Sequence, residues 1–198
     1  MKKSVVIVGG SIAGLTTALV LASAKNSELD FDITIIDDDK GDLKIAAIYN
    51  MPLFPMGAEA KEILETTKKQ IDSLLKVKYI QGSVTEVSGS KGDFVVKGAD
   101  FSQKGEYVVL ATGASRFDIQ GLGDIVRPHT LMNKPNKIKL ACSGRQMVKE
   151  GVYAAGLASG VTTQVACAIG SAAEAACAIL SDIKGEVSIV HDTPTSRK

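Results

Sequence analysis

The alternation of apolar and polar segments begins with a short strand that leads into a helix. Residues 5–8 are all apolar, which is typical of a strand buried on both faces. Glycines follow at positions 9, 10 and 14, and an apolar segment from about 12 to 25 predicts a helix. Residues 31–36 form a second apolar strand that ends in Asp37. The pattern therefore predicts a strand–helix–strand unit of an α/β protein.

Two further helices and several strands are predicted along the rest of the chain. Residues 58–76 carry apolar positions at helical spacing, and residues 162–180 form a long alanine-rich helix. Strands are predicted at residues 77–81, 83–88, 93–97, 105–110 and 151–155. Glycine-bearing turns separate the first three of these strands, so we expect them to form a small antiparallel insertion. Residues 115–150 lack a clear period and predict loops or connecting strands.

The glycine-rich turn after the first strand is suited to binding a dinucleotide. Gly9 allows a tight turn, and the free N–H groups and dipole at the start of the following helix favour a pyrophosphate. Asp37 lies 23 residues after Gly14, where the dinucleotide fold places an acidic residue for the ribose hydroxyls. Ser11 occupies the middle glycine position of G-x-G-x-x-G, and its hydroxyl can donate to phosphate. The alternative is a glycine-rich turn without a ligand, followed by a solvated acidic turn.

Composition narrows the classes of function. The 198 residues, 45% of them hydrophobic, suffice for one domain, which we assign to residues 1–191, with a polar tail at 192–198. A net charge of +1 predicts no basic surface for nucleic acid. We expect no apolar stretch long enough for a membrane span. The cysteines at 142, 167 and 177 form no C-x-x-C pair, which favours a reducing, cytoplasmic location over disulfides or a zinc site.

The loop at residues 50–57 and a few titratable side chains have more than one interpretation. The loop contains two prolines, two methionines and a phenylalanine, which either plug the edge of the core or cover a flat ligand. Tyr49, His129 and Tyr153 are the only candidates for proton transfer, and a structural role is the alternative for each. Cys142 has no partner at usable spacing, so we expect an ordinary thiol.

Four segments, in this order, resemble the FAD-binding domain of the thioredoxin reductase-like pyridine nucleotide-disulfide oxidoreductases. They are VVIVGGSIAGLTTAL at 5–19, the NMPLFPMG loop with the helix after it, YVVLATGA at 107–114, and GVYAAG at 151–156 followed by TTQVACAIGSAAEAA. The resemblance covers about residues 4–117 and 138–181. It implies an α/β, Rossmann-like FAD-binding domain with three layers, a parallel central sheet and a small antiparallel β insertion. It also implies FAD rather than NAD as the bound dinucleotide.

The resemblance further implies roles for individual residues. The first turn would hold the FAD pyrophosphate, Asp37 the adenosine ribose, and Gly156 would lie beside the pyrophosphate and ribityl chain. The last helix would direct its N-terminus at the pyrimidine side of the flavin, where negative charge collects on reduction. The implied cofactor-binding residues are Gly9, Gly10, Ser11, Ile12, Ala13, Gly14, Asp37, Asp38, Val84, Ala111, Thr112, Gly113, Gly156, Leu157, Thr163, Gln164 and Val165.

The chain also departs from the family pattern at three points. The family reads GVYAAGD where this chain has Leu157, so the bond from an aspartate to the ribityl chain is missing. The family inserts an NADPH-binding domain between the ATG and GVYAAG segments, and residues 114–150 are too short to form one. The redox-active C-x-x-C pair of that domain is missing as well.

These observations favour a single-domain FAD-binding oxidoreductase that takes electrons from free NAD(P)H or from a partner protein. One alternative is a non-catalytic FAD- or nucleotide-binding module, such as an electron-carrier subunit, and another is a protein that binds NAD but never FAD. Because members of the family are usually dimers, and the slim alanine-rich helix leaves apolar surface to spare, we expect a homo-oligomer, most simply a dimer. The catalytic residues do not follow from the sequence.

Overall fold

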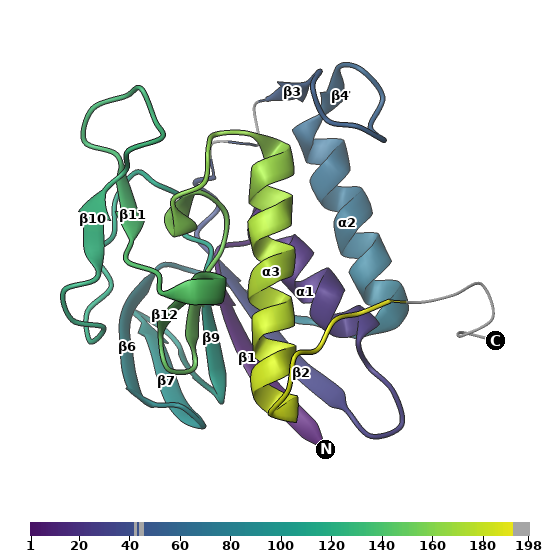
Figure 1. Cartoon of the computed structure of the whole chain (residues 1–198), viewed down its shortest axis with the longest axis vertical. Coiled ribbons are helices and arrows are strands. Elements are labelled where there is room, and N and C mark those ends of the chain that lie inside the picture. The colour runs from purple at the N-terminus through teal and green to yellow at the C-terminus, as the bar shows by residue number, and fades with distance from the viewer. Residues whose placement is uncertain (42, 44–45, 192–198) are drawn as a thin grey trace.

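A mostly parallel sheet of six strands forms the centre of the molecule (Figure 1). The computed structural model describes residues 1–41, 43 and 46–191, and the tail predicted at 192–198 lies outside this part of the chain. The strands lie in the spatial order β12 (Met147–Lys149), β13 (Val152–Ala154), β9 (Tyr107–Leu110), β1 (Lys2–Val8), β2 (Asp30–Asp37) and β5 (Lys78–Gln81). All neighbours are parallel except β12 and β13.

Helices cover one face of this sheet, and an antiparallel sheet covers the other. The helices are α1 (Ile12–Ser23), α2 (Ala60–Leu74) and α3 (Val165–Lys184), and the antiparallel sheet consists of β6 (Val84–Ser90), β7 (Asp93–Gly98) and β8 (Ser102–Gly105). Alternate side chains of a strand point to opposite faces, so Val5 and Ile7 of β1 join the core under the helices. Val6 and Val8 join the core under the antiparallel sheet. Burial on both faces explains the uninterrupted apolar run of the first strand.

Two small hairpins stand at the end of the molecule where α3 begins (Figure 1). One pairs β3 (Ala47–Ile48) with β4 (Ala58–Glu59), and the other pairs β10 (Val126–Pro128) with β11 (Ile138–Leu140). Two 3-10 helices, η2 (Gly144–Gln146) and η3 (Gly156–Ser159), flank β12 and β13. The second hairpin and η2 occupy the stretch for which the sequence predicts only loops or connecting strands.

The structure confirms the predicted fold class and corrects two predicted strands. Residues 77–81 do not belong to the antiparallel insertion, because β5 pairs in parallel with β2 at the edge of the central sheet. The strand predicted at 105–110 is divided between sheets: β8 ends at Gly105 in the antiparallel sheet, and β9 begins at Tyr107 in the central sheet. A Cβ at Gly105 would lie 2.8 Å from Val6 Cγ2, so the chain passes very close to β1 where it changes layers.

Helix α3 is long and apolar enough, by length and composition alone, to cross a membrane. This finding corrects the expectation that the chain contains no apolar stretch long enough for a membrane span. In the structure, half of the most apolar 18-residue segment of α3 is buried, and the helix packs against α1. The contact is close: Thr17 Oγ1 on α1 donates to Ala13 O at 3.0 Å and lies 3.4 Å from Ala172 O on α3. Packing against α1 accounts for the alanine content of α3.

A polar cluster fastens the end of α3 to the two sheets. Asp182 accepts hydrogen bonds from Lys91 Nζ and from the Tyr107 hydroxyl, both at 2.7 Å. Lys91 comes from the β6–β7 turn and Tyr107 from β9, so one carboxylate joins three layers. Burial alone would raise the pKa of Asp182, but the bonds from Lys91 and Tyr107 outweigh burial and hold the pKa below its ordinary value.

Asp182→Asn is expected to lower the free energy of unfolding by about 1–2 kcal/mol at pH 7, because Lys91 loses its charged partner. A lowered folded-state pKa means that the carboxylate stabilises the fold above the unfolded pKa of about 4 and loses this effect as the pH falls through the folded pKa. Chemical denaturation of the variant and of the unmodified protein at pH 7 and pH 3 measures the loss of stability at each pH. Asp32→Asn, at an exposed position of β2, is the control. An equal loss at both pH values would contradict the assignment.

Candidate functional site

The carboxyl ends of four parallel strands lie level with one another. In the sheet register, Val8 pairs with Ile36 of β2 and with Leu110 of β9, and Leu110 pairs with Ala154 of β13. The next residue of each strand therefore lies in one row across the sheet, and these residues are Asp37, Gly9, Ala111 and Ala155. Open parallel sheets bind their ligands at this edge.

The turn between β1 and α1 depends on two glycines. The Gly9 N–H donates to Ile36 O at 2.7 Å, and Gly9 has φ +110°, a left-handed conformation that disfavours other residues. A Cβ on Gly14 would lie 1.9 Å from Gly9 O, so the first turn of α1 is pressed against the end of β1. These two glycines set where α1 begins. Its cap residue, Ser11, makes no side-chain cap hydrogen bond, which leaves N–H groups at the helix start without a cap from the described residues.

Asp37 lies directly beside this turn. A Cβ on Gly10 would come within 2.9 Å of Asp37 Cβ and 3.1 Å of Asp37 Oδ2, which gives a structural reason for glycine at position 10. Asp38 is engaged elsewhere: its carboxylate accepts from Ser83 Oγ at 3.2 Å and pairs with Lys40 at 3.5 Å. Val84, at the start of β6, packs against the core under the antiparallel sheet. Of the residues predicted after the first turn, Asp37 is thus the best placed to meet a ligand.

The segment after β9 contains a buried hydroxyl with no partner. Among the described residues and their contacts, Thr112 Oγ1 is buried and makes no hydrogen bond. An unpaired buried hydroxyl costs free energy, so a ligand atom is its natural partner. Gly113, the next residue, has φ +73°, and a Cβ there would meet nothing within 4 Å. The backbone at this point therefore borders open space beside the row of strand ends.

The start of α3 and the segment before it close the other side of the site. A Cβ on Gly156 would lie 2.8 Å from Ala13 Cβ, so η3 touches the first turn of α1. The Gly156 N–H donates to Ser171 Oγ at 2.9 Å, which ties η3 to α3. The cap residue of α3, Gln164, makes no side-chain cap bond, and no acidic residue lies in the first turn. The N-termini of α1 and α3 both present free N–H groups.

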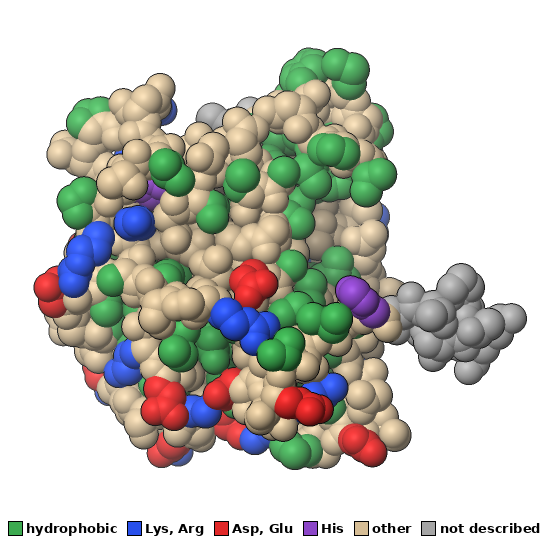
Figure 2. Space-filling model, in the orientation of Figure 1, with side chains coloured by type: hydrophobic (Ala, Val, Ile, Leu, Met, Phe, Trp, Pro, Cys, Tyr) green, Lys and Arg blue, Asp and Glu red, His purple; other side chains and the backbone are tan. Residues whose placement is uncertain are grey.

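The proline-containing loop at 50–57 reaches the start of α3. Asn50 Nδ2 donates to Gln164 Oε1 at 2.7 Å. Met51 and Phe54 pack against the core under the helices, whereas Leu53 is 99% exposed and Met56 81% exposed. Figure 2 shows apolar side chains gathered over this hairpin. The loop therefore serves in part as a plug of the core edge, and Leu53 and Met56 remain available to another molecule.

The candidates for proton transfer differ in their surroundings. Tyr49 is exposed on the β3–β4 hairpin. Burial, and then Asp182, raise the pKa of Tyr153 to about 12, which does not suit proton donation near neutral pH. Burial likewise raises the pKa of Cys142, and Lys139 offsets only part of this effect, so this thiol is not activated. His129 is buried and is considered below.

The structure thus brings most of the predicted residues together at one edge of the sheet, and their role in cofactor binding stays a prediction. Residues 9–14, Asp37, residues 111–113 and Gly156 form the row and its surroundings, and Thr163, Gln164 and Val165 lie at the start of α3. Sequence analysis missed Asn50 and Ser171, which position α3 and η3. A serine or an asparagine gives no periodic signal, so neither was identifiable. The described residues contain no group of three or more metal-ligating side chains.

Comparisons with known proteins agree with this geometry. Residues 3–196 match the model of a family described as pyridine nucleotide-disulphide oxidoreductase. The structure resembles a thioredoxin reductase from Gloeobacter violaceus with a TM-score of 0.77 and 18% identity, over 97% of this chain and 98% of that one. It also resembles an oxidoreductase from Agrobacterium tumefaciens (TM-score 0.75, 17% identity, 94% and 100% covered). A ferredoxin-flavin thioredoxin reductase from Clostridium acetobutylicum is similar too (TM-score 0.67, 13% identity, 93% and 99% covered). No curated protein matches the sequence.

Proposed function

The chain belongs to the pyridine nucleotide-disulphide oxidoreductase family, and we propose that it is an FAD-binding oxidoreductase. The observation that carries this proposal is the Thr112 hydroxyl, which has no partner in the described part of the chain, at the edge where four parallel strands end. The groups around it suit a dinucleotide: N–H donors at the start of α1, a carboxylate at Asp37, and open space at Gly113.

In this proposal each part of the site has a separate task. The free N–H groups of α1 and the Ser11 hydroxyl bind the pyrophosphate, and the Asp37 carboxylate accepts hydrogen bonds from the adenosine ribose. The N–H groups that begin α3 would favour negative charge on the pyrimidine side of the flavin. Gln164, held by Asn50, fixes the start of that helix. When bound, FAD supplies the redox chemistry by accepting and giving up a hydride or electrons.

We further propose that the electrons come from free NAD(P)H or from a partner protein. The three cysteines of the chain are free thiols, and their sequence positions form no C-x-x-C pair that could relay electrons. The free thiols also support a reducing, cytoplasmic location. Exposed Leu53 and Met56 support association of two copies of the chain.

A non-catalytic FAD- or nucleotide-binding module is the second candidate function. Leu157 favours it, because this half-buried side chain lies in η3, just after β13, and can accept no hydrogen bond from the ribityl chain. A protein that binds NAD and never FAD is the third candidate. Flavin content separates the candidates that bind FAD from a protein that does not, and turnover separates the FAD-binding enzyme from the FAD-binding module.

Anaerobic mixing of the flavin-loaded protein with NADH or NADPH is expected to bleach the visible flavin absorbance within seconds. The expected cause is direct transfer of electrons from the pyridine nucleotide to the bound flavin. Stopped-flow absorbance measures the rate, and the same mixture without protein is the control. Bleaching no faster than with free FAD, with both donors and with a chemically reduced electron-transfer protein, would contradict the enzyme and favour the binding module. Protein that stays colourless after reconstitution with FAD would contradict FAD binding and leave the NAD-binding protein standing.

A further inference from the structure

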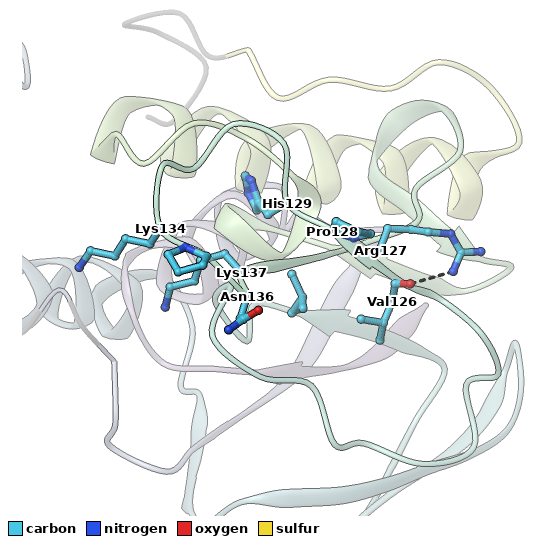
Figure 3. A pocket seen from close by; sticks show the side chains of 9 residues that line it. Val126, Arg127, Pro128, His129, Lys134, Asn136 and Lys137 are labelled. Carbon is cyan, nitrogen blue, oxygen red and sulfur yellow. Dashed lines mark hydrogen bonds between the residues drawn. The ribbon is translucent and has the colours of Figure 1, made fainter.

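The β10–β11 hairpin carries a cavity of about 440 Å³ outside the row of strand ends (Figure 3). Its lining comes entirely from the hairpin, and consists of Val126, Arg127, Pro128, His129, Lys134, Pro135, Asn136, Lys137 and Ile138. Figure 3 shows the side chains of Lys134 and Arg127 extending in opposite directions from this cavity. The site proposed for FAD uses none of these residues.

The register of the hairpin collects basic residues on one face. Arg127 lies opposite Lys139, and Pro128 lies opposite Ile138. One step further, the His129 N–H donates to Lys137 O at 2.8 Å, which places His129 opposite Lys137. Because side chains alternate between faces, these four basic residues share one face, and the other carries the proline and the isoleucine. Like charges directly across a strand pair are destabilising, so an anion between them would relieve the repulsion.

His129 offers this face a hydrogen-bond donor. The Leu131 N–H donates to His129 Nδ1 at 3.2 Å, so Nδ1 is the acceptor, and in the neutral ring Nε2 carries the proton. His129 is only 7% exposed, and within the described part of the chain its Nε2 makes no hydrogen bond. A buried N–H without a partner is costly, so the missing partner is an acceptor atom.

The charges on this face are incompletely balanced. Arg127 is paired, since its guanidinium donates to Asp124 at 3.0 Å and to Val126 O at 2.8 Å. Lys137 Nζ donates to Ser115 Oγ at 2.8 Å and has no acidic partner among the described residues. Lys139 is half-buried and likewise forms no ion pair with a described residue. Lys137 and His129 line the cavity, and Lys139 lies two positions along β11 on the same face, outside the lining. This face therefore offers two ammonium groups and one N–H donor to an acceptor with negative charge.

The hairpin also adjoins the strand ends. The Ile138 N–H donates to Ala114 O at 2.9 Å, two residues after Thr112. A Cβ on Gly160 would lie 2.7 Å from Lys139 Cδ, which places Lys139 beside the segment that leads into α3. A ligand on the basic face would thus lie next to the site proposed for FAD.

We propose that the cavity and basic face of the β10–β11 hairpin bind a phosphate group of a soluble ligand. Two ammonium groups and an N–H donor match a dianionic phosphate better than a singly charged carboxylate. The identification of this ligand as the second reactant, a phosphorylated electron donor or acceptor, rests on the proposed function. The binding of phosphate itself does not.

Histidine NMR tests phosphate binding directly, because the chain contains only two histidines. The Cε1–H resonance of His129 is expected to shift saturably with inorganic phosphate at constant ionic strength, and that of His191, assigned with His191→Gln, to stay in place. Lys137→Gln is expected to weaken phosphate at least fivefold. Lys61→Gln, the same change at an exposed position of α2, is the matched control and should change the affinity less than twofold. Acetate should bind at least tenfold more weakly than phosphate.

Several results would overturn the proposal: no saturable shift of His129, equal shifts of both histidines, equal weakening by both lysine variants, or equal affinity for acetate. The titration is run on protein with and without flavin. Phosphate binding by a protein that never retains FAD would support this inference while contradicting the proposed function. A parallel titration with NADP⁺ distinguishes the source of the phosphate: tighter binding than inorganic phosphate indicates a nucleotide, and weaker binding indicates a small free phosphate.

Discussion

Gly14→Ala is expected to abolish flavin retention and to lower the free energy of unfolding by about 3 kcal/mol. The added methyl group would lie 1.9 Å from Gly9 O and 3.2 Å from Ile7 Cγ2, so α1 must move away from β1. That movement displaces the N–H groups that we assign to the pyrophosphate. Valine at this position should be at least as damaging, because its side chain is larger and branched.

Gly170→Ala is the matched control for this prediction. It adds the same methyl group to a glycine inside a helix, at an exposed position of α3 where the Cβ meets nothing within 4 Å. Alanine should stabilise the helix by about 0.5–1 kcal/mol and leave flavin retention unchanged. Flavin content after purification and thermal unfolding measure both variants. Full flavin stoichiometry in a folded Gly14→Ala protein would show that this turn does not bind the cofactor.

Thr112→Val is expected to have opposite effects on stability and on cofactor affinity. Without cofactor the Thr112 hydroxyl is buried and unpaired among the described residues, so its replacement by a methyl group should raise the stability of the flavin-free protein by about 1 kcal/mol. If the hydroxyl meets an acceptor on FAD, its loss should weaken FAD about tenfold. A mutation with only a packing effect would move both quantities in the same direction.

Thr112→Ser provides the control, because it keeps the hydroxyl and removes the methyl group. Its affinity for FAD should stay within about threefold of that of the unmodified protein. Fluorescence titration of flavin-free protein with FAD measures affinity, and chemical denaturation of the same samples measures stability. Unchanged FAD affinity in Thr112→Val would mean that another group meets this hydroxyl.

The local features of the nucleotide site were predictable because neighbouring residues carry them. The turn at Gly9 and Gly14 follows a buried strand, and Asp37 ends the next strand at the spacing that a strand–helix–strand unit requires. Such a unit closes within about 35 residues, so its register follows from the order of its elements. The glycine-rich turn was therefore recognisable as a candidate nucleotide site although Ser11 replaces the usual middle glycine.

Prediction failed where a strand could join either of two sheets. The strand at 77–81 has the same short apolar pattern as those after it, yet β5 lies beside β2 in the central sheet. Periodicity reports which faces of a strand are buried and not which neighbour it pairs with. The division at Gly105 has a similar cause, since the chain changes layers there without a break in its apolar pattern.

The sequence by itself determined the strand–glycine turn–helix unit, the acidic end of the second strand and the α/β class, because these depend on residues close together in the chain. Only the tertiary structure decided that Thr112 has no hydrogen-bond partner among the described residues, that Asn50 holds the start of α3, and that His129 lies opposite Lys137. Each of these depends on strand register or on contacts between distant segments. The free energy of such contacts comes from desolvation and packing in three dimensions, which no short-range pattern of residues records.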